Sequence, residues 1–128
     1  MEAILHITEE IIDTFAEFSG DKNPIHVDEK FASRTPFKKR IAHGTIILAK
    51  ISKLLTDKMG QGNILLSEEI KFLKPTYIGD ILKIKVIEIT PLENSVKKLD
   101  IVTLNQKGEK VLDCIATCRK VPVLNERK

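Results

Sequence analysis

Residues 44–55, GTIILAKISKLL, are the stretch that decides the fold. When these residues are placed on a helix, apolar side chains occupy most of its circumference, which predicts a helix largely buried in the core. The glycine-containing residues 60–63, GQGN, predict the end of this region. A helix of this kind needs apolar surface around it, and the sequence after residue 63 supplies that surface.

The second half of the chain alternates between apolar and polar residues, as half-buried strands do. Strands are predicted at residues 70–72, 82–86, 99–101 and 111–121. Turns are predicted at residues 77–80 and 106–109. Because short turns join antiparallel neighbours, the sequence predicts an α+β fold with an antiparallel sheet wrapped around one apolar helix.

The first part of the chain predicts short helices and loops. Thr8 can cap a helix in which Ile11, Phe15 and Phe18 form one buried stripe. Gly20 is then expected to end that helix. No linker or repeat separates this part from the strands, so we expect one domain over residues 1–128.

The composition is typical of a globular protein and excludes several classes of function. Hydrophobic residues make up 42% and charged residues 30%, which argues against disorder. A net charge of +3, with 5% aromatic residues and no tryptophan, argues against a nucleic-acid partner. No apolar run approaches the roughly 20 residues that cross a membrane. The N-terminus also lacks the features of a signal peptide, so we expect no membrane partner and a cytoplasmic location.

Two cysteines, Cys114 and Cys118, lie four residues apart in the last predicted strand. Their Cα atoms would be about 13 Å apart in an extended strand, whereas a disulfide needs less than about 7 Å. The strand prediction therefore excludes a disulfide between them. We expect two small buried side chains on one face of the sheet.

The stretch most indicative of chemistry is residues 20–26, GDKNPIH. Asp21 and His26 are residue types suited to proton transfer near neutral pH. Gly20 and Pro24 favour a turned loop that can bring these two side chains together. The same residues also fit a plain turn capped by Asp21, so the residue types alone leave both interpretations open.

Residues 41–44, IAHG, lead into the apolar helix. If Gly44 begins that helix, its N–H group is an unpaired donor at the positive end of the helix. Such a donor can stabilise an oxyanion, and the missing side chain lets a ligand approach closely. An acid–base pair beside an oxyanion site suggests chemistry next to a carbonyl group.

Residues 15–32, FAEFSGDKNPIHVDEKFA, closely resemble the signature of the MaoC-like (R)-specific enoyl-CoA hydratases, a family with the hot-dog fold. That signature has an aromatic residue, then Gly-Asp-x-Asn-Pro-aliphatic-His, then a small residue. Phe15 and Ala32 fit its two ends. Residues 41–44 and residues 72–80, FLKPTYIGD, are similar to two further elements of the family. The resemblance therefore covers nearly the whole chain.

The resemblance implies which residues carry the function. Asp21 and His26 match the family's catalytic pair, and Asn23 matches the residue that helps to position a water molecule. The residues implied at the thioester oxygen and around the substrate are Gly44, His43 and Ser52.

The implied reaction is the reversible addition of water to a trans-2-enoyl-CoA, which gives an (R)-3-hydroxyacyl-CoA and needs no metal or other cofactor. The nearest alternative is the same chemistry on an acyl-carrier-protein thioester, as in a 3-hydroxyacyl-acyl-carrier-protein dehydratase. An acyl-CoA thioesterase and a non-catalytic acyl-CoA-binding module are further alternatives.

The implied partners are a thioester substrate and a second copy of the chain. In the family the site lies between two subunits or repeated halves, and only one unit is present, so we expect a homodimer. Residues 38–40, KKR, form the only compact basic cluster, which suits either a solvated loop or a contact with carrier phosphates or an acidic carrier protein. The sequence departs from the family pattern at Phe18, Thr45 and Lys50, and the departures at Phe18 and Lys50 leave the preferred acyl length open.

Overall fold

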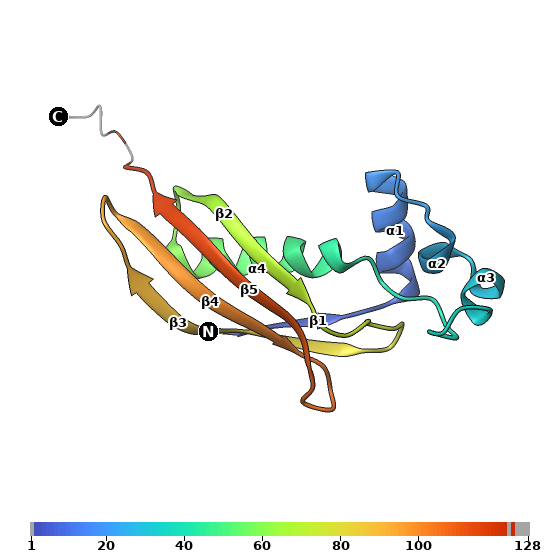
Figure 1. Ribbon diagram of the computed structural model, residues 1–128. Helices are drawn as coiled ribbons and strands as arrows, with labels where there is room; N and C mark the ends of the chain where they lie inside the picture. The colour runs from blue at the N-terminus through green and yellow to red at the C-terminus, as the bar shows by residue number, and fades with distance from the viewer. Residues whose placement is uncertain (1, 123, 125–128) are drawn as a thin grey trace.

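The computed structural model describes residues 2–122 and 124, in which helices pack beside one antiparallel sheet (Figure 1). The elements, in chain order, are β1 (Glu2–His6), α1 (Glu9–Ser19), α2 (Pro24–Val27), α3 (Glu29–Ser33), α4 (Gly44–Met59), β2 (Asn63–Phe72), β3 (Ile81–Pro91), β4 (Val96–Leu104) and β5 (Lys110–Lys120). The strands pair in the order β1-β3-β4-β5-β2. Among the helices of the described residues, none has the length and apolar character needed to cross a membrane.

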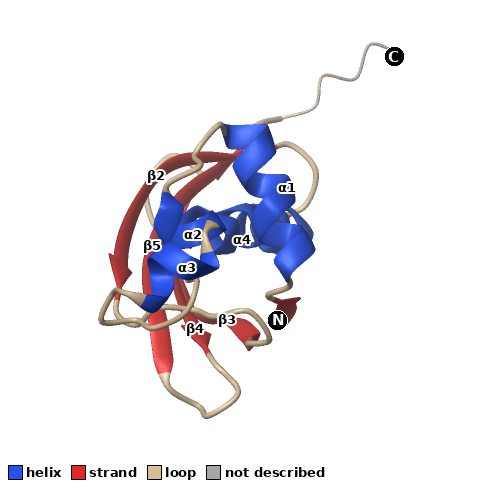
Figure 2. Ribbon diagram, turned by 90° about the vertical axis from the view of Figure 1, so that its right-hand side faces the viewer, coloured by secondary structure: helices blue, strands red, loops and turns tan. Residues whose placement is uncertain are grey.

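The sheet curls around α4, and α1, α2 and α3 gather near the end at which α4 begins (Figures 1 and 2). The predicted arrangement of an antiparallel sheet around one long helix is therefore confirmed. The side chains from the central strands that join the core with α4 include Leu82, Ile84, Leu99, Ile101 and Leu112. Burying a side chain of this size stabilises the folded state by about 1.5–3 kcal/mol, so this contact holds the helix on the sheet.

α4 is less buried than the sequence predicted. The residues that face the sheet, each 6% exposed or less, are Ile46, Ile47, Ile51, Leu54 and Leu55. The opposite side is exposed and includes Thr45, Ala49 and Ser52. The expectation of burial around most of the circumference is wrong for the single chain, because the sheet covers only one side of the helix.

α1 has the predicted ends, and its buried face differs from the predicted stripe at Phe18. Thr8 Oγ1 accepts a hydrogen bond from the N–H of Ile11 at 3.1 Å, and Gly20 ends the helix. The buried residues are Ile12 and Ala16, however, and Phe18 is 87% exposed. Ile11 and Phe15 are partly buried and pack against the core, so the predicted stripe fails only at Phe18, because helical spacing shows which side chains share a face but not how far that face is covered.

The strand β1 was not predicted. It pairs antiparallel with β3, with Ala3 opposite Ile84 and Leu5 opposite Leu82. Leu5 is buried and the residues beside it are exposed, which is the alternation expected of a half-buried strand. A five-residue segment carries too few alternations to identify it from sequence alone.

Cys114 and Cys118 are both free and buried on β5, as predicted. Both side chains belong to the core that packs against α4. The Cys114 thiol donates a hydrogen bond to Glu68 Oε2 at an S–O distance of 3.7 Å.

We expect both thiols to resist modification in the folded protein. Burial, followed by the nearby Glu68 carboxylate, raises the pKa of Cys114 to about 12, and burial also raises the pKa of Cys118. Because the thiolate is the reactive form, a chromogenic disulfide reagent at about pH 8 should label native protein at least tenfold more slowly than denatured protein. Rapid labelling of the native protein would contradict the placement of these residues in β5.

Candidate active site

The loop between α1 and α2 is shaped by polar side chains that bind the backbone two residues ahead. Gly20 has a φ of 78°, which glycine adopts without strain. Asp21 Oδ1 accepts a hydrogen bond from the N–H of Asn23 at 3.2 Å. Asn23 Oδ1 accepts one from the N–H of Ile25 at 3.3 Å and so caps α2, which begins at Pro24. The predicted loop therefore ends earlier than expected, in one helical turn.

The ring of His26 is fixed by the backbone of a distant residue. Its Nδ1 atom lies 2.7 Å from the carbonyl oxygen of Ile41. A carbonyl oxygen can only accept a hydrogen bond, so Nδ1 carries the proton. In the neutral ring Nε2 is then left with a lone pair, which is the form required to accept a proton.

His43 lies behind His26 and is only 2% exposed. The two imidazole rings are stacked, with centroids 3.9 Å apart and an interplanar angle of 28°. Phe15 lies on His43 as well, at a centroid distance of 4.8 Å. The Nε2–H group of His43 donates a hydrogen bond to the backbone oxygen of Asp21 at 2.9 Å. His43 therefore supports both members of the predicted pair from inside the protein.

The structure brings Asp21, His26 and His43 into one cluster. One carboxylate oxygen and one ring nitrogen from each histidine lie within 4.8 Å of one another. These are metal-ligand types, but the geometry does not suit one shared ion. A ring nitrogen binds a metal in the plane of its ring, and the planes of stacked rings do not meet at a common point between them. The cluster is better suited to moving a proton.

Gly44 begins α4 and lines a pocket of about 300 Å³ together with His26. The other walls are mainly apolar and include Ile47 and Phe72. His43, which caps α4, makes no side-chain hydrogen bond to the first turn, so that turn presents N–H donors at the positive end of the helix. A Cβ atom at Gly44 would overlap the Phe72 ring. The glycine therefore leaves room for the Phe72 ring against the start of α4.

Ser52 is not brought to this cluster within the chain. It lies eight residues after Gly44, which is about 12 Å along a helix axis, and its side chain is exposed. It does not line the pocket that contains His26 and Gly44. A role for Ser52 near the substrate remains a prediction.

Two residues that hold the site were missed by sequence reasoning. Ile41 acts through its backbone carbonyl, so its side chain gave no signal.

Arg40 is 5% exposed and binds acidic residues on α1, whereas Lys38 and Lys39 are exposed. The predicted basic cluster is therefore wrong as a single patch, because its arginine points inward. The sequence signal that could have indicated this was the pair of acids four residues apart in α1, Glu9 and Asp13, which lie on one face of a helix and can bind one arginine.

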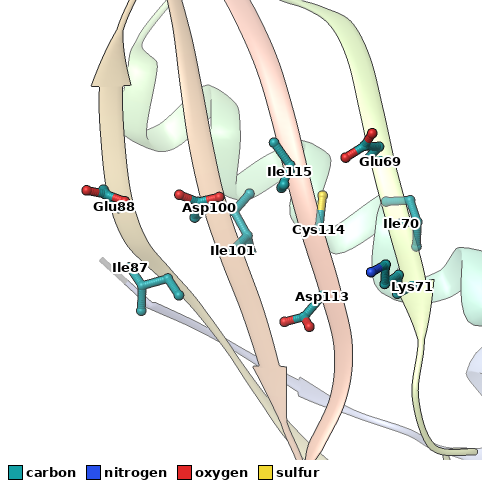
Figure 3. A pocket seen from close by; sticks show the side chains of 10 residues that line it. All are labelled: Glu69, Ile70, Lys71, Ile87, Glu88, Asp100, Ile101, Asp113, Cys114 and Ile115. Carbon is teal, nitrogen blue, oxygen red and sulfur yellow. The ribbon is translucent and has the colours of Figure 1, made fainter.

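Other pockets lie away from the acid–base pair, and two of them bear on the predictions or on the sheet. One of about 750 Å³ lies on the face of the sheet opposite α4 and is lined by the carboxylates of Glu69, Asp100 and Asp113 (Figure 3). Another of about 430 Å³ lies between α1 and α4 and is mainly apolar. Phe18 and Lys50, two of the departures from the family pattern, line this second pocket.

Comparison with known proteins identifies the family and the fold. The family model for the MaoC-like domain matches residues 1–109. The chain belongs to the MaoC-like family. The unliganded R-hydratase PhaJ1 from Pseudomonas aeruginosa superposes with a TM-score of 0.84 and 32% identity, over 100% of this chain and 87% of that one. An (R)-hydratase from Aeromonas caviae superposes with a TM-score of 0.87 and 27% identity, over 94% of this chain and 93% of that one. These neighbours confirm the predicted hot-dog fold.

Curated relatives of this MaoC-like chain are similar over a shorter segment. It is 48% identical over 73 residues to a 3-hydroxybutyryl-CoA dehydratase of Methylorubrum extorquens, covering 56% of this chain and 46% of the relative. It is 44% identical over 75 residues to an (R)-specific enoyl-CoA hydratase of Rhodospirillum rubrum, covering 58% and 52% respectively. The matched segment thus spans about half the length of these relatives.

We expect the stability of the protein not to depend on a metal ion at the cluster of Asp21, His26 and His43. Treatment with a chelator should leave the thermal unfolding midpoint unchanged, and added zinc chloride should not raise it, since an ion bound to the native state would raise it by mass action. A zinc-dependent rise in the midpoint that is lost in His26→Gln would contradict the geometric argument.

Proposed function

We propose that this protein catalyses the reversible hydration of trans-2-enoyl-CoA thioesters to (R)-3-hydroxyacyl-CoA thioesters. The observation that carries the proposal is the approach of the Asp21 carboxylate to the His26 ring, within 4.8 Å, beside a pocket that Gly44 lines. The names of the similar hydratases and dehydratases support it.

The acid–base pair acts on a water molecule. Each hydrogen bond to such a molecule spans about 2.8 Å, so one water can bind both groups at the observed separation. Its two hydrogens point to the Asp21 carboxylate and to Nε2 of His26, and its lone pair is left free to attack C3 of the substrate. Asp21 accepts the proton as the new C–O bond forms, and His26 orients the water and shares that proton.

Negative charge develops on the thioester oxygen during this attack. The first N–H groups of α4, beginning at Gly44, stabilise that charge. Loss of one such donor costs about 3 kcal/mol in other enzymes. The acid–base pair then returns a proton to C2, so that one water molecule is added overall and the protein ends in its starting protonation state. Asn23 positions the water through its side-chain amide.

We favour coenzyme A over an acyl carrier protein as the carrier. The M. extorquens and R. rubrum relatives are named for CoA thioesters, although a mitochondrial 3-hydroxyacyl-[acyl-carrier-protein] dehydratase of Arabidopsis thaliana is 32% identical over 71 residues. The burial of Arg40 leaves Lys38 and Lys39 of the predicted cluster exposed, which suits the phosphates of coenzyme A as well as an acidic carrier protein, so the preference rests on the names of these relatives.

We also propose that the active form is a homodimer in which residues 1–128 of each chain form one hot-dog unit. β2 is one of the two edge strands of the sheet, and within the described residues its one partner strand is β5. Its apolar side chains are exposed by 44%, 44% and 49% at Ile64, Leu65 and Leu66. An edge strand with exposed apolar residues invites pairing with another chain. A second copy would cover this edge and add a wall to the substrate pocket.

The proposed reaction predicts a loss of activity when either member of the pair is neutralised. Asp21→Asn and His26→Gln should each lower kcat on crotonyl-CoA by about 10²–10⁴-fold, the usual contribution of a positioned acid or base. The rate is followed by the loss of absorbance of the conjugated thioester, and the product should be the (R) isomer. Lys22→Gln is the matched control, since Lys22 lies in the same loop and its ion pair, with Glu17, is exposed.

Wild-type rates in Asp21→Asn and His26→Gln would rule out the assignment. Release of free thiol from a saturated acyl-CoA would identify a thioesterase instead. Binding of enoyl-CoA without turnover would identify a non-catalytic binding module.

The proposed dimer predicts that a charge on β2 reduces both assembly and activity. The wild-type chain should sediment at twice the mass of one chain, and Leu66→Lys should shift it toward the monomer and lower kcat/KM. Ile87→Lys is the control, because Ile87 is 65% exposed but lies on β3. A fully active wild-type monomer would contradict the proposal.

A further inference from the structure

Arg40 is a buried charge whose acidic partners are exposed. Its side chain is 6% exposed, against 68% for Glu9 and 55% for Asp13. A guanidinium group does not lose its proton in proteins, so burial requires acceptors for its N–H groups. The positions of those acceptors show what the arginine holds in place.

Three nitrogens of Arg40 bind acceptors on two different elements. Nη1 donates to Glu9 Oε1 at 3.2 Å, and Nη2 donates to Asp13 Oδ1 at 2.7 Å. These two carboxylates lie four residues apart, on one face of α1. Nε donates to the backbone oxygen of His26 at 2.6 Å. The planar guanidinium therefore ties α2 to the first turns of α1.

The bond to His26 matters because α2 has only four residues. A helix of this length has no stability of its own, and the carbonyl groups at its end have no partners within the helix. The position of His26 must therefore be imposed by contacts from outside α2. Arg40 supplies such a contact to the backbone of His26 itself.

The residue after Arg40 holds the same turn. The N–H of Ile41 donates to the backbone oxygen of Ile25 at 3.2 Å, and its carbonyl accepts the Nδ1–H of His26 at 2.7 Å. Arg40 and Ile41 thus bind the backbone and the ring of His26 from one short segment. A shift of that segment would change the direction of the His26 ring and remove the hydrogen bond that keeps the proton on Nδ1.

We propose that Arg40 is a positioning residue that fixes the orientation and tautomer of His26 through the backbone. That Arg40 affects catalysis through His26 rests on the proposed function. Arg40 does not line the pocket that contains His26 and Gly44, so its effect on the reaction is indirect. It acts on the placement of Nε2, and not on binding of the substrate.

The kinetic test compares Arg40→Met with Arg40→Lys. Arg40→Met should lower kcat by up to about 10²-fold, the cost of a misplaced catalytic group, while KM changes by less than about twofold because substrate contacts remain. Arg40→Lys keeps the charge but not the planar fork, so it should restore part of kcat. Lys30→Met is the matched control, since Lys30 is an exposed cation on α3 outside these contacts and should give wild-type rates.

A second readout needs no substrate. Long-range nitrogen–proton NMR spectra distinguish a proton on Nδ1 from one on Nε2. The wild-type spectrum should show His26 with its proton on Nδ1, and Arg40→Met should show a mixture of both forms. If Arg40→Met does not fold, Asp13→Asn weakens the same link while leaving an oxygen acceptor, and it should shift the spectrum in the same direction.

The two readouts separate the two proposals. An unchanged His26 spectrum and unchanged kcat in folded Arg40→Met would overturn the positioning role. A rise in KM, with kcat and the tautomer of His26 unchanged, would also overturn it. Inactivity of the wild-type chain on every enoyl thioester would refute the proposed function, whereas the NMR comparison would still test the role of Arg40.

Discussion

Burial of one apolar face of α4 against the sheet is the constraint on which the rest of the molecule depends. Ile46, Ile51 and Leu55 reach the core because the sheet curls around the helix. The same packing fixes where α4 begins, so that Gly44 lies at the pocket beside His26. Rotation of α4 about its axis would carry the first N–H groups away from the acid–base pair even if the preceding loop kept its shape.

Features set by near neighbours in the chain could be predicted from the sequence, and features set by distant contacts could not. The cap at Thr8 and the stop at Gly20 are confirmed because each depends on residues within one turn. The predicted burial of Phe18 failed because it depends on which elements cover α1. β1 was missed because its five residues carry too few alternations, and its partner β3, almost eighty residues further along the chain, adds no local signal.

The candidate site shows the same division. The family resemblance pointed to Asp21 and His26, and the structure brings these two together. It gave no indication of what holds them, since Ile41 acts through a carbonyl group that every residue has. Arg40 looked like part of a surface cluster because its acceptors lie between 14 and 31 residues away. The residues of the pair can thus be identified from the local sequence, whereas their orientation depends on the tertiary structure.

The register of the sheet also limits the order in which the strands can pair while the chain is being synthesised. β1 leaves the ribosome first, yet its first residue pairs with Lys85. β2 must likewise wait for β5, where Asn63 pairs with Lys120. Pairings between residues so far apart close late and slow the folding of a chain. The β1–β3 pair can therefore form before the β2–β5 pair, since Lys85 is made before Lys120, and Leu5 stays in contact with water until β3 has been made.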